Sequence, residues 1–162
     1  MIPKREHARN SEQTYFVTSS TWDRRPLFRA QPFPELFVAV LQQYRGSSYL
    51  LHEFVLMPDR IHLLITPHEA LERAAQKIKG GFSFRVKKEL GSNAEIWQRG
   101  FTDHRIRDWD DYRQHREYIY LNPARAGLCG DAKKYPYCSY GVGWDAVPQR
   151  LKPPELDAVR HG

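Results

Sequence analysis

One stretch of the chain decides the fold, and it reads Val55-Leu-Met-Pro-Asp-Arg-Ile-His-Leu-Leu-Ile-Thr66, two apolar runs separated by a break. Pro58 fixes its own φ and Asp59 favours turns, while the residues on either side suit strands. We therefore predict the end of one strand, a tight connection and the start of the next. Arg60 and His62 are two residues apart on the second strand, so their side chains point to the same face of the sheet. Taken alone, this pair is most simply a surface arginine beside a half-buried histidine.

The segments around this hairpin alternate between strand and helix patterns. β-branched and aromatic residues indicate strands, and apolar residues at steps of three and four indicate amphipathic helices. We predict a strand at 15–22, a helix at 34–44, strands at 49–57 and 61–66, a helix at about 69–90, a strand within 96–107 and a helix from 109 to about 121.

This order predicts an α+β fold, a ferredoxin-like βαββαβ antiparallel sheet with helices on one face and an additional C-terminal helix. Gly80 and Gly81 interrupt the long helix pattern, so either the helix bends there or a neighbouring group comes close. Asp108 has the position of an N-cap for the last helix. We expect Pro123 to end that helix, because the residue before a proline avoids the α region.

Length and composition favour one domain over residues 1–162, with a flexible arm at 1–13 and an irregular tail at 141–162. The two cysteines, Cys129 and Cys138, are too few for a disulfide framework. The N-terminus lacks a signal-peptide core, and no apolar run approaches membrane-spanning length. We therefore expect a cytoplasmic protein with no membrane partner.

The formal net charge of +6 is concentrated in one segment of the chain. Residues 73–107 contain nine lysines and arginines but only three acids, and aromatic residues lie among them. A solvated helix face would show the same charges, but the clustering favours a surface for single-stranded nucleic acid with aromatic stacking platforms. The residues expected to bind nucleic acid are Arg60, Arg73, Lys77, Lys79, Arg85, Lys87, Lys88, Arg99, Arg105 and Arg107, and the aromatic residues are Phe82, Phe84, Trp97 and Phe101.

The last helix carries a second chemical pair, Tyr118 and Asn122, which are four residues apart and share a face. A tyrosine here is either an amphipathic residue with a buried ring or a nucleophile. As a nucleophile it needs a metal, a base or cations nearby, because a phenol has a pKa of about 10. The carbonyl oxygen of Asn122 suits a hard divalent ion.

Four segments together resemble one family. Met57-Pro-Asp-Arg-Ile-His-Leu-Leu64 resembles the Met-Pro-Asn/Asp-His-hydrophobic-His-Leu-Leu motif of the single-tyrosine HUH transposases. The segments 97–107, 118–128 and 135–140 are similar to downstream blocks of the REP-associated tyrosine transposases in that superfamily. The resemblance covers about residues 14–140.

The resemblance implies a ferredoxin-like enzyme that nicks and rejoins single-stranded DNA near hairpins of repetitive extragenic palindromes (REP). In this family two histidines and a residue on the tyrosine helix hold Mg²⁺ or Mn²⁺, and the tyrosine forms a 5′-phosphotyrosine. Carried over by position, Tyr118 is the catalytic nucleophile, and His62 and Asn122 are metal ligands. Such proteins act as monomers or homodimers.

The chain departs from the motif at Arg60, which occupies the position of the first histidine. Arginine has no lone pair for a metal and is always charged. Either nicking is weakened or lost and the chain only binds structured single-stranded nucleic acid, or Arg60 replaces the metal on the phosphate, or another histidine supplies the ligand. His52 and His104 are the alternative ligands. A general phosphoesterase would leave Tyr118 without a purpose.

Overall fold

The computed structural model describes residues 12–140, 142 and 144–153. Nearly all of the expected flexible arm and part of the expected irregular tail (141, 143 and 154–162) therefore lie outside the described residues. Among the residues that are described, no helix is both long enough and apolar enough to cross a membrane.

Four strands form one antiparallel sheet in the order β2-β3-β1-β4. Their bounds are β1 Tyr15–Ser20, β2 Tyr49–Met57, β3 Arg60–Pro67 and β4 Thr102–Arg105. The predicted hairpin is confirmed, since Met57 pairs with Arg60 across the turn at residues 58 and 59. The sheet order together with the βαββαβ succession is the predicted ferredoxin-like arrangement.

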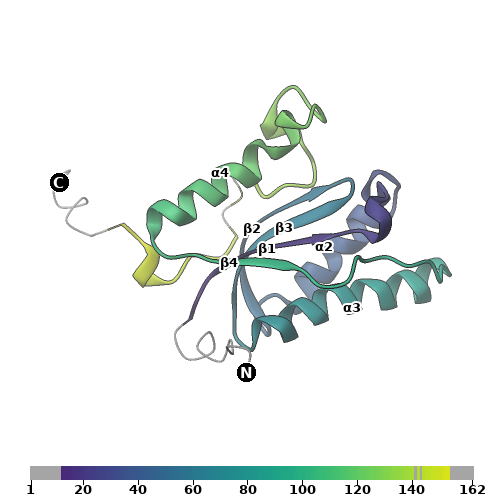
Figure 1. Cartoon of the computed structure of the whole chain (residues 1–162), viewed down its shortest axis with the longest axis horizontal. Coiled ribbons are helices and arrows are strands. Elements are labelled where there is room, and N and C mark those ends of the chain that lie inside the picture. The colour runs from purple at the N-terminus through teal and green to yellow at the C-terminus, as the bar shows by residue number, and fades with distance from the viewer. Residues whose placement is uncertain (1–11, 141, 143, 154–162) are drawn as a thin grey trace.

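The helices cover both faces of this sheet. Figure 1 shows α2 (Phe33–Tyr44) and α3 (Leu71–Leu90) on one side and α4 (Trp109–Arg125) on the other. Each face has its own apolar cluster, with Phe37 and Phe82 in the α2/α3 cluster and Tyr112 and Ile119 in the α4 cluster. Because side chains alternate along a strand, the even-numbered residues of β1 and β3 face α4.

The pair of glycines does not break α3, which is continuous over its twenty residues. A Cβ at Gly81 would lie 2.9 Å from Cε2 of Tyr44, whereas a Cβ at Gly80 would meet nothing within 4 Å. The sequence had left open whether the helix bends at the glycines or a neighbouring group comes close. At Gly81 a neighbouring group comes close, and it is the Tyr44 side chain of α2.

The expected end of the last helix was wrong. Asp108 caps α4 as predicted, and its side chain accepts a hydrogen bond from the Asp111 N–H. The helix then continues through Pro123 to Arg125. Proline cannot donate to the Ile119 carbonyl, but the Cys138 thiol donates to it at 3.8 Å and so compensates for the missing partner.

Four short 3₁₀ turns complete the described chain: η1 Trp22–Arg24, η2 Leu27–Arg29, η3 Ala132–Lys134 and η4 Gln149–Leu151. The first strand ends at Ser20 rather than at residue 22, because η1 follows directly with positive φ angles at Asp23 and Arg24. The described tail packs back on the body, where the Asp145 carboxylate accepts hydrogen bonds from Arg45 and from the Leu51 N–H.

Candidate active site

An open pocket of about 590 Å³ lies between the sheet and α4. Alternate residues of β1 and β3 face α4, whose own residues and Arg24 of η1 complete the wall. Arg60 and His62 share this face, as their spacing predicted. The lining residues are Phe16, Thr18, Ser20, Arg24, Arg60, His62, Gln114, His115 and Tyr118.

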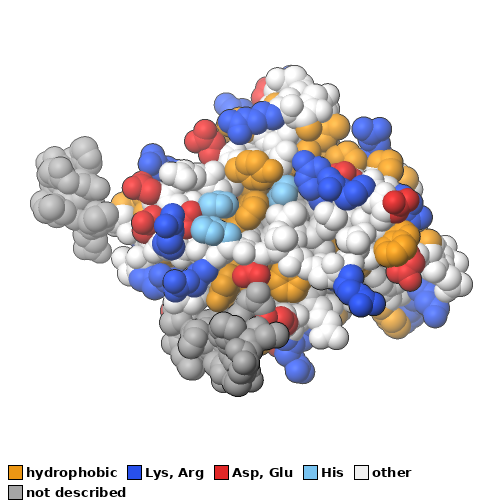
Figure 2. Space-filling view, in the orientation of Figure 1, with side chains coloured by type: hydrophobic (Ala, Val, Ile, Leu, Met, Phe, Trp, Pro, Cys, Tyr) orange, Lys and Arg blue, Asp and Glu red, His pale blue; other side chains and the backbone are white. Residues whose placement is uncertain are grey.

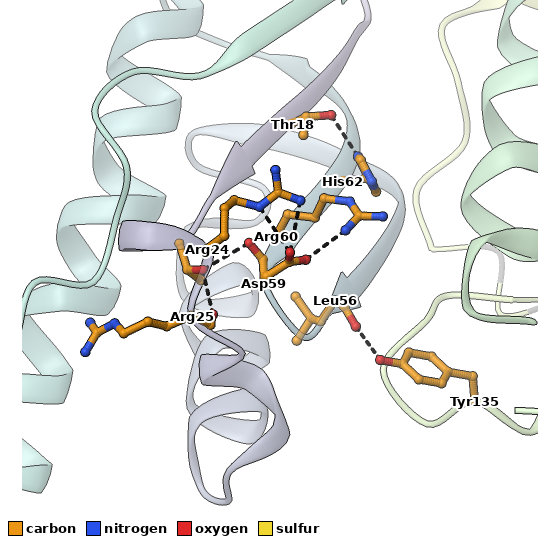
Figure 3. Close-up of polar contacts among 9 residues, drawn as sticks. Thr18, Arg24, Arg25, Leu56, Asp59, Arg60, His62 and Tyr135 are labelled. Carbon is orange, nitrogen blue, oxygen red and sulfur yellow. Dashed lines mark hydrogen bonds and ion pairs between the residues drawn. The ribbon is translucent and has the colours of Figure 1, made fainter. Parts of the chain in front are cut away.

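His62 lies at the base of the pocket and is 3% exposed. Its Nδ1 is 2.7 Å from the hydroxyl of Thr18, its partner across β1 and β3 (Figure 3). Its Nε2 is buried and has no hydrogen-bond partner among the described residues. Burial, reinforced by the Arg60 cation and opposed by the Asp59 carboxylate, lowers the pKa of His62 to about 4. The imidazole is therefore neutral at pH 7 and offers a free ring nitrogen.

Asp59 fixes two arginines at the mouth of the pocket. Its Oδ1 accepts from Arg60 Nη1 at 2.7 Å, and its Oδ2 accepts from Arg24 Nε at 3.0 Å, as Figure 3 shows. The carboxylate uses only part of each guanidinium, since an arginine has five N–H donors. The remaining donors can bind an anion such as a phosphate.

Tyr118 projects into the same pocket from α4. Its ring lies edge-on to those of His62, at a centroid distance of 5.3 Å, and Phe16, at 5.9 Å. The side chain is 41% exposed, and its hydroxyl makes no hydrogen bond with the residues that the structure describes. The ring is thus held by packing while the hydroxyl remains available to a substrate.

Asn122 is not brought into this pocket. It is 6% exposed, it is not among the lining residues, and its Nδ2 has no partner among the described residues. The position at which the resemblance implies a metal ion therefore offers one imidazole nitrogen from His62 and a guanidinium from Arg60. One nitrogen beside a cation does not fit Mg²⁺ or Mn²⁺, which need several neutral or anionic ligands.

A separate group of possible metal ligands lies next to the pocket: His104, Asp111 and His115. His104 Nε2 is 2.8 Å from Asp111 Oδ2, and His115 Nδ1 is 3.2 Å from Asp111 Oδ1. Burial would raise the pKa of Asp111, but hydrogen bonds from the Arg107 N–H and from His104 outweigh it and lower that pKa. Figure 2 shows histidine side chains near the middle of this face, close to hydrophobic and basic side chains.

The sequence had suggested His104 as a substitute ligand but missed His115 and treated Asp111 only as a helix-start acid. A helical-face signal was present, because Asp111, His115 and Tyr118 follow one another at steps of four and three. His52, the other suggested substitute, has both ring nitrogens occupied. Its Nδ1 is 2.7 Å from the Asp145 carbonyl, and its Nε2 is 2.7 Å from Thr66 Oγ1, so it is not free to bind an ion.

Most of the expected nucleic-acid residues lie on α3, on the face of the sheet opposite Tyr118 (Figure 1). Several of these cations are held within the protein. Lys77 pairs with Glu69 at 2.9 Å, Arg73 approaches the same carboxylate at 3.5 Å, Arg85 pairs with Glu89, and Lys79 donates to the carbonyls of Gln98 and Gly100.

The remaining cations of that segment are more open to solvent. Lys87, Lys88 and Arg99 are exposed, Arg105 belongs to β4, and Arg107 follows β4 beside α4. The prediction that Phe82 is a stacking platform is wrong, because its ring is fully buried in the core. Phe84, another expected platform, is 62% exposed.

A second hollow of about 380 Å³ adjoins the pocket and shares Arg24 and Arg60 with it. Arg29 adds a third cation there, and the other lining residues are Pro26, Met57, Pro58, Asp59, Ala126 and Leu128. The two hollows together form a basic groove that leads to Tyr118.

Comparison with known proteins places this fold in a class. No protein-family model matches the chain. A solved structure of a REP-associated tyrosine transposase bound to a REP hairpin superposes with a TM-score of 0.62 over 88% of this chain and 93% of that chain, at 22% identity. The chain therefore shares the fold of that protein.

Two relatives identify the family more closely. The REP-associated tyrosine transposase of Escherichia coli K12 is 25% identical over 130 residues, covering 78% of this chain and 76% of that protein. A protein of Haemophilus influenzae assigned the same name is 31% identical over 138 residues, covering 78% of each. The chain belongs to the REP-associated tyrosine transposases.

Proposed function

We propose that this protein nicks and rejoins single-stranded DNA beside a REP-type hairpin, with Tyr118 as the nucleophile. The observation that carries the proposal is the environment of Tyr118. Its half-exposed side chain lies in a pocket with two arginines that can bind a phosphate. A solved family member bound to a REP hairpin supports the choice of substrate.

The pocket supports each part of this reaction through its own residues. Arg24 and Arg60, fixed by Asp59, would hold the scissile phosphate and stabilise the charge that builds on it. Tyr118 Oη bonds to phosphorus while its proton passes to water. The bond from phosphorus to O3′ breaks, and O3′ takes a proton from water. The product is a 5′-phosphotyrosine, whose bond energy is kept for rejoining.

The DNA path follows from the distribution of cations. We propose that the single strand runs along the basic groove of Arg24, Arg29 and Arg60, and that exposed Lys87 and Lys88 on α3 contact more distant phosphates of the hairpin. Tyr118 and His62 of the same chain line one pocket, so we propose that a monomer carries out the chemistry. We further propose that this activity is cytoplasmic, where its DNA substrate would lie.

The test is a covalent-adduct assay with 3′-end-labelled hairpin DNA from the repeats flanking the gene, including the single-stranded flank, because the 5′-phosphotyrosine keeps the 3′ fragment on the protein. After incubation with Mn²⁺ or with Mg²⁺, the sample is denatured and run on a protein gel. A labelled band that is absent in Tyr118→Phe and present in Tyr120→Phe, on the same helix, supports the proposal. A band that persists in Tyr118→Phe refutes the assignment of the nucleophile.

One observation favours a second function, hairpin binding without cutting. The Arg60 guanidinium occupies the first ligand position of the motif and is held there by Asp59 at 2.7 Å. If binding is the whole function, wild type shifts hairpin DNA on a gel without forming an adduct, and Arg60→His recovers adduct formation. The Mg²⁺ or Mn²⁺ dependence of the family would then have been lost with the first histidine.

A further inference from the structure

We propose that His104, Asp111 and His115 form a binding site for one divalent transition-metal ion of the Mn²⁺, Co²⁺ or Zn²⁺ class. The site lies where β4 meets α4. It is distinct from the Arg60 and His62 position of the family motif.

The geometry of the three side chains carries this inference. One ligand atom from each residue lies within 4.8 Å of the others. The His104 and His115 rings stack at a centroid distance of 4.7 Å with an interplanar angle of 18°. Because an imidazole lone pair lies in the plane of its ring, one of the two rings has to turn before both can coordinate the same ion. Turning the partly exposed His104 ring and closing these spacings would surround an ion with metal–ligand bonds of about 2.0–2.2 Å.

The fold brings these residues together from two elements. On α4, Asp111 and His115 are four apart and therefore on one face. On β4, His104 pairs with Phe16 of β1, and the Phe16 ring lies 4.8 Å from that of His115. The Arg107 N–H donates to Asp111 at 2.9 Å and so orients the carboxylate. An ion at this position would join the edge strand to the start of the tyrosine helix.

The charge of the group also suits a cation. The Asp111 side chain is 4% exposed, and a buried carboxylate needs positive partners. A carboxylate only accepts hydrogen bonds, so each imidazole contact needs a proton on the ring nitrogen. A divalent ion can take the place of those protons. The Arg107 guanidinium approaches Asp111 at 3.5 Å, but its side chain is 71% exposed and can turn into solvent.

The donor set selects the kind of ion. Two imidazoles and one carboxylate are a common ligand set for zinc and other transition metals, whereas Mg²⁺ prefers oxygen ligands and retains its water. Three protein ligands leave an open coordination position. The side chain of His104 is 41% exposed and that of His115 is 24% exposed, so an ion can enter from solvent.

The direct test is calorimetric titration of the chelator-treated full chain with MnCl₂ and ZnCl₂, without DNA. We expect one ion per chain, and a loss of affinity of at least about tenfold in His104→Asn, in Asp111→Asn and in His115→Asn. His68→Asn, a histidine outside the group, is the matched control and should bind as wild type does. Circular dichroism of each metal-free variant verifies that it is folded.

Three results would overturn the site. The first is no binding by wild type. The second is binding that none of the three substitutions weakens. The third is a loss of binding in His62→Asn while His104→Asn binds normally, which would place the ion at the family motif. The visible spectrum of the Co²⁺ complex gives an independent measure, since imidazole coordination to Co²⁺ should disappear in His104→Asn.

A consequence for catalysis rests on the proposed function. His115 belongs both to this group and to the Tyr118 pocket. If Tyr118 forms an adduct, His104→Asn should lower the yield in Mn²⁺ while gel-shift binding of the hairpin is kept. Normal titration without any adduct in wild type would refute the proposed function and leave the ion site intact, so the two failures can be told apart.

Discussion

Arg60→His replaces a guanidinium that cannot bind a metal with an imidazole beside His62. The fold should tolerate the change. The lost ion pair joins Arg60 to Asp59 at 2.7 Å, with the two side chains 25% and 24% exposed, and such pairs contribute about 0.2–1 kcal/mol. Asp59 also retains Arg24 as its partner at 2.9 Å.

The expected gain is divalent affinity at the motif position. Two imidazoles on one face of β3 would replace one imidazole beside a cation, and we expect Mn²⁺ to bind there at least about tenfold more tightly, or about 1.4 kcal/mol. Calorimetry should be done in the His104→Asn background, which removes the other group of ligands. Equal Mn²⁺ affinity with and without Arg60→His would refute our placement of the motif site.

Arg60→Gln is the matched control, because it removes the same charge without adding a ligand. In this variant the pKa of His62 should rise above its value of about 4 but stay below the ordinary 6.5, because burial is the larger cause of the shift. A lowered histidine pKa means that wild type loses stability as the pH falls from 6.5 to about 4, and Arg60→Gln should lose less. An NMR titration of the His62 ring measures the shift, and an unchanged pKa would show that Arg60 does not act on this imidazole.

Three further predictions concern the rest of the molecule. Reversing the charge of Lys87 and Lys88 to Glu should weaken hairpin binding and make it less dependent on salt. In gel shifts, the slope of log affinity against log salt concentration should fall by about 0.7 for each phosphate that is no longer neutralised, and an unchanged slope would exclude α3 from the DNA path. Gly80→Ala should raise the free energy of unfolding by about 1 kcal/mol in urea denaturation, and Gly81→Ala should raise it by less because the added Cβ meets the ring of Tyr44. Equal increases in the two variants would contradict the close approach of Tyr44. Burial raises the pKa of Glu53, so the folded protein loses stability as the pH rises above the ordinary pKa of a glutamate. Glu53→Gln should therefore show a smaller fall in melting temperature between pH 4 and pH 8 than wild type, and parallel pH profiles would contradict this effect of Glu53.

The sequence predicted the β2–β3 hairpin well because its signals are local. The two apolar runs, the proline turn and strand propensities all agree over residues 55–66, and the shared face of Arg60 and His62 follows from the strand period. The helix end at Pro123 was wrong for the opposite reason. The Ile119 carbonyl finds its partner in Cys138, nineteen residues away, and no local rule includes that interaction.

The candidate site shows the same division between local and long-range information. The step from Asp111 to His115 to Tyr118 is visible in the sequence, because it lies on one helix. The approach of His104 depends on β4 being the edge strand beside β1, which single-sequence patterns place poorly. Composition also revealed a basic segment, but it could not show on which face of the sheet that segment lies. The cations of α3 were therefore grouped with Tyr118, which lies on the opposite face.

The interactions of Arg60 bear on whether the replacement of the first motif histidine is only the loss of a metal ligand. A residue that only replaced a missing ligand would need no partner of its own. Arg60 instead shares the Asp59 carboxylate with Arg24, and the Asp59 carbonyl accepts hydrogen bonds from the N–H and hydroxyl of Thr21 at 2.9 and 3.1 Å. These hydrogen bonds hold two guanidinium groups at the entrance to the Tyr118 pocket, in an arrangement suited to a phosphate. We therefore propose that Arg60 binds the phosphate of the substrate directly, and that any metal ion binds at another position.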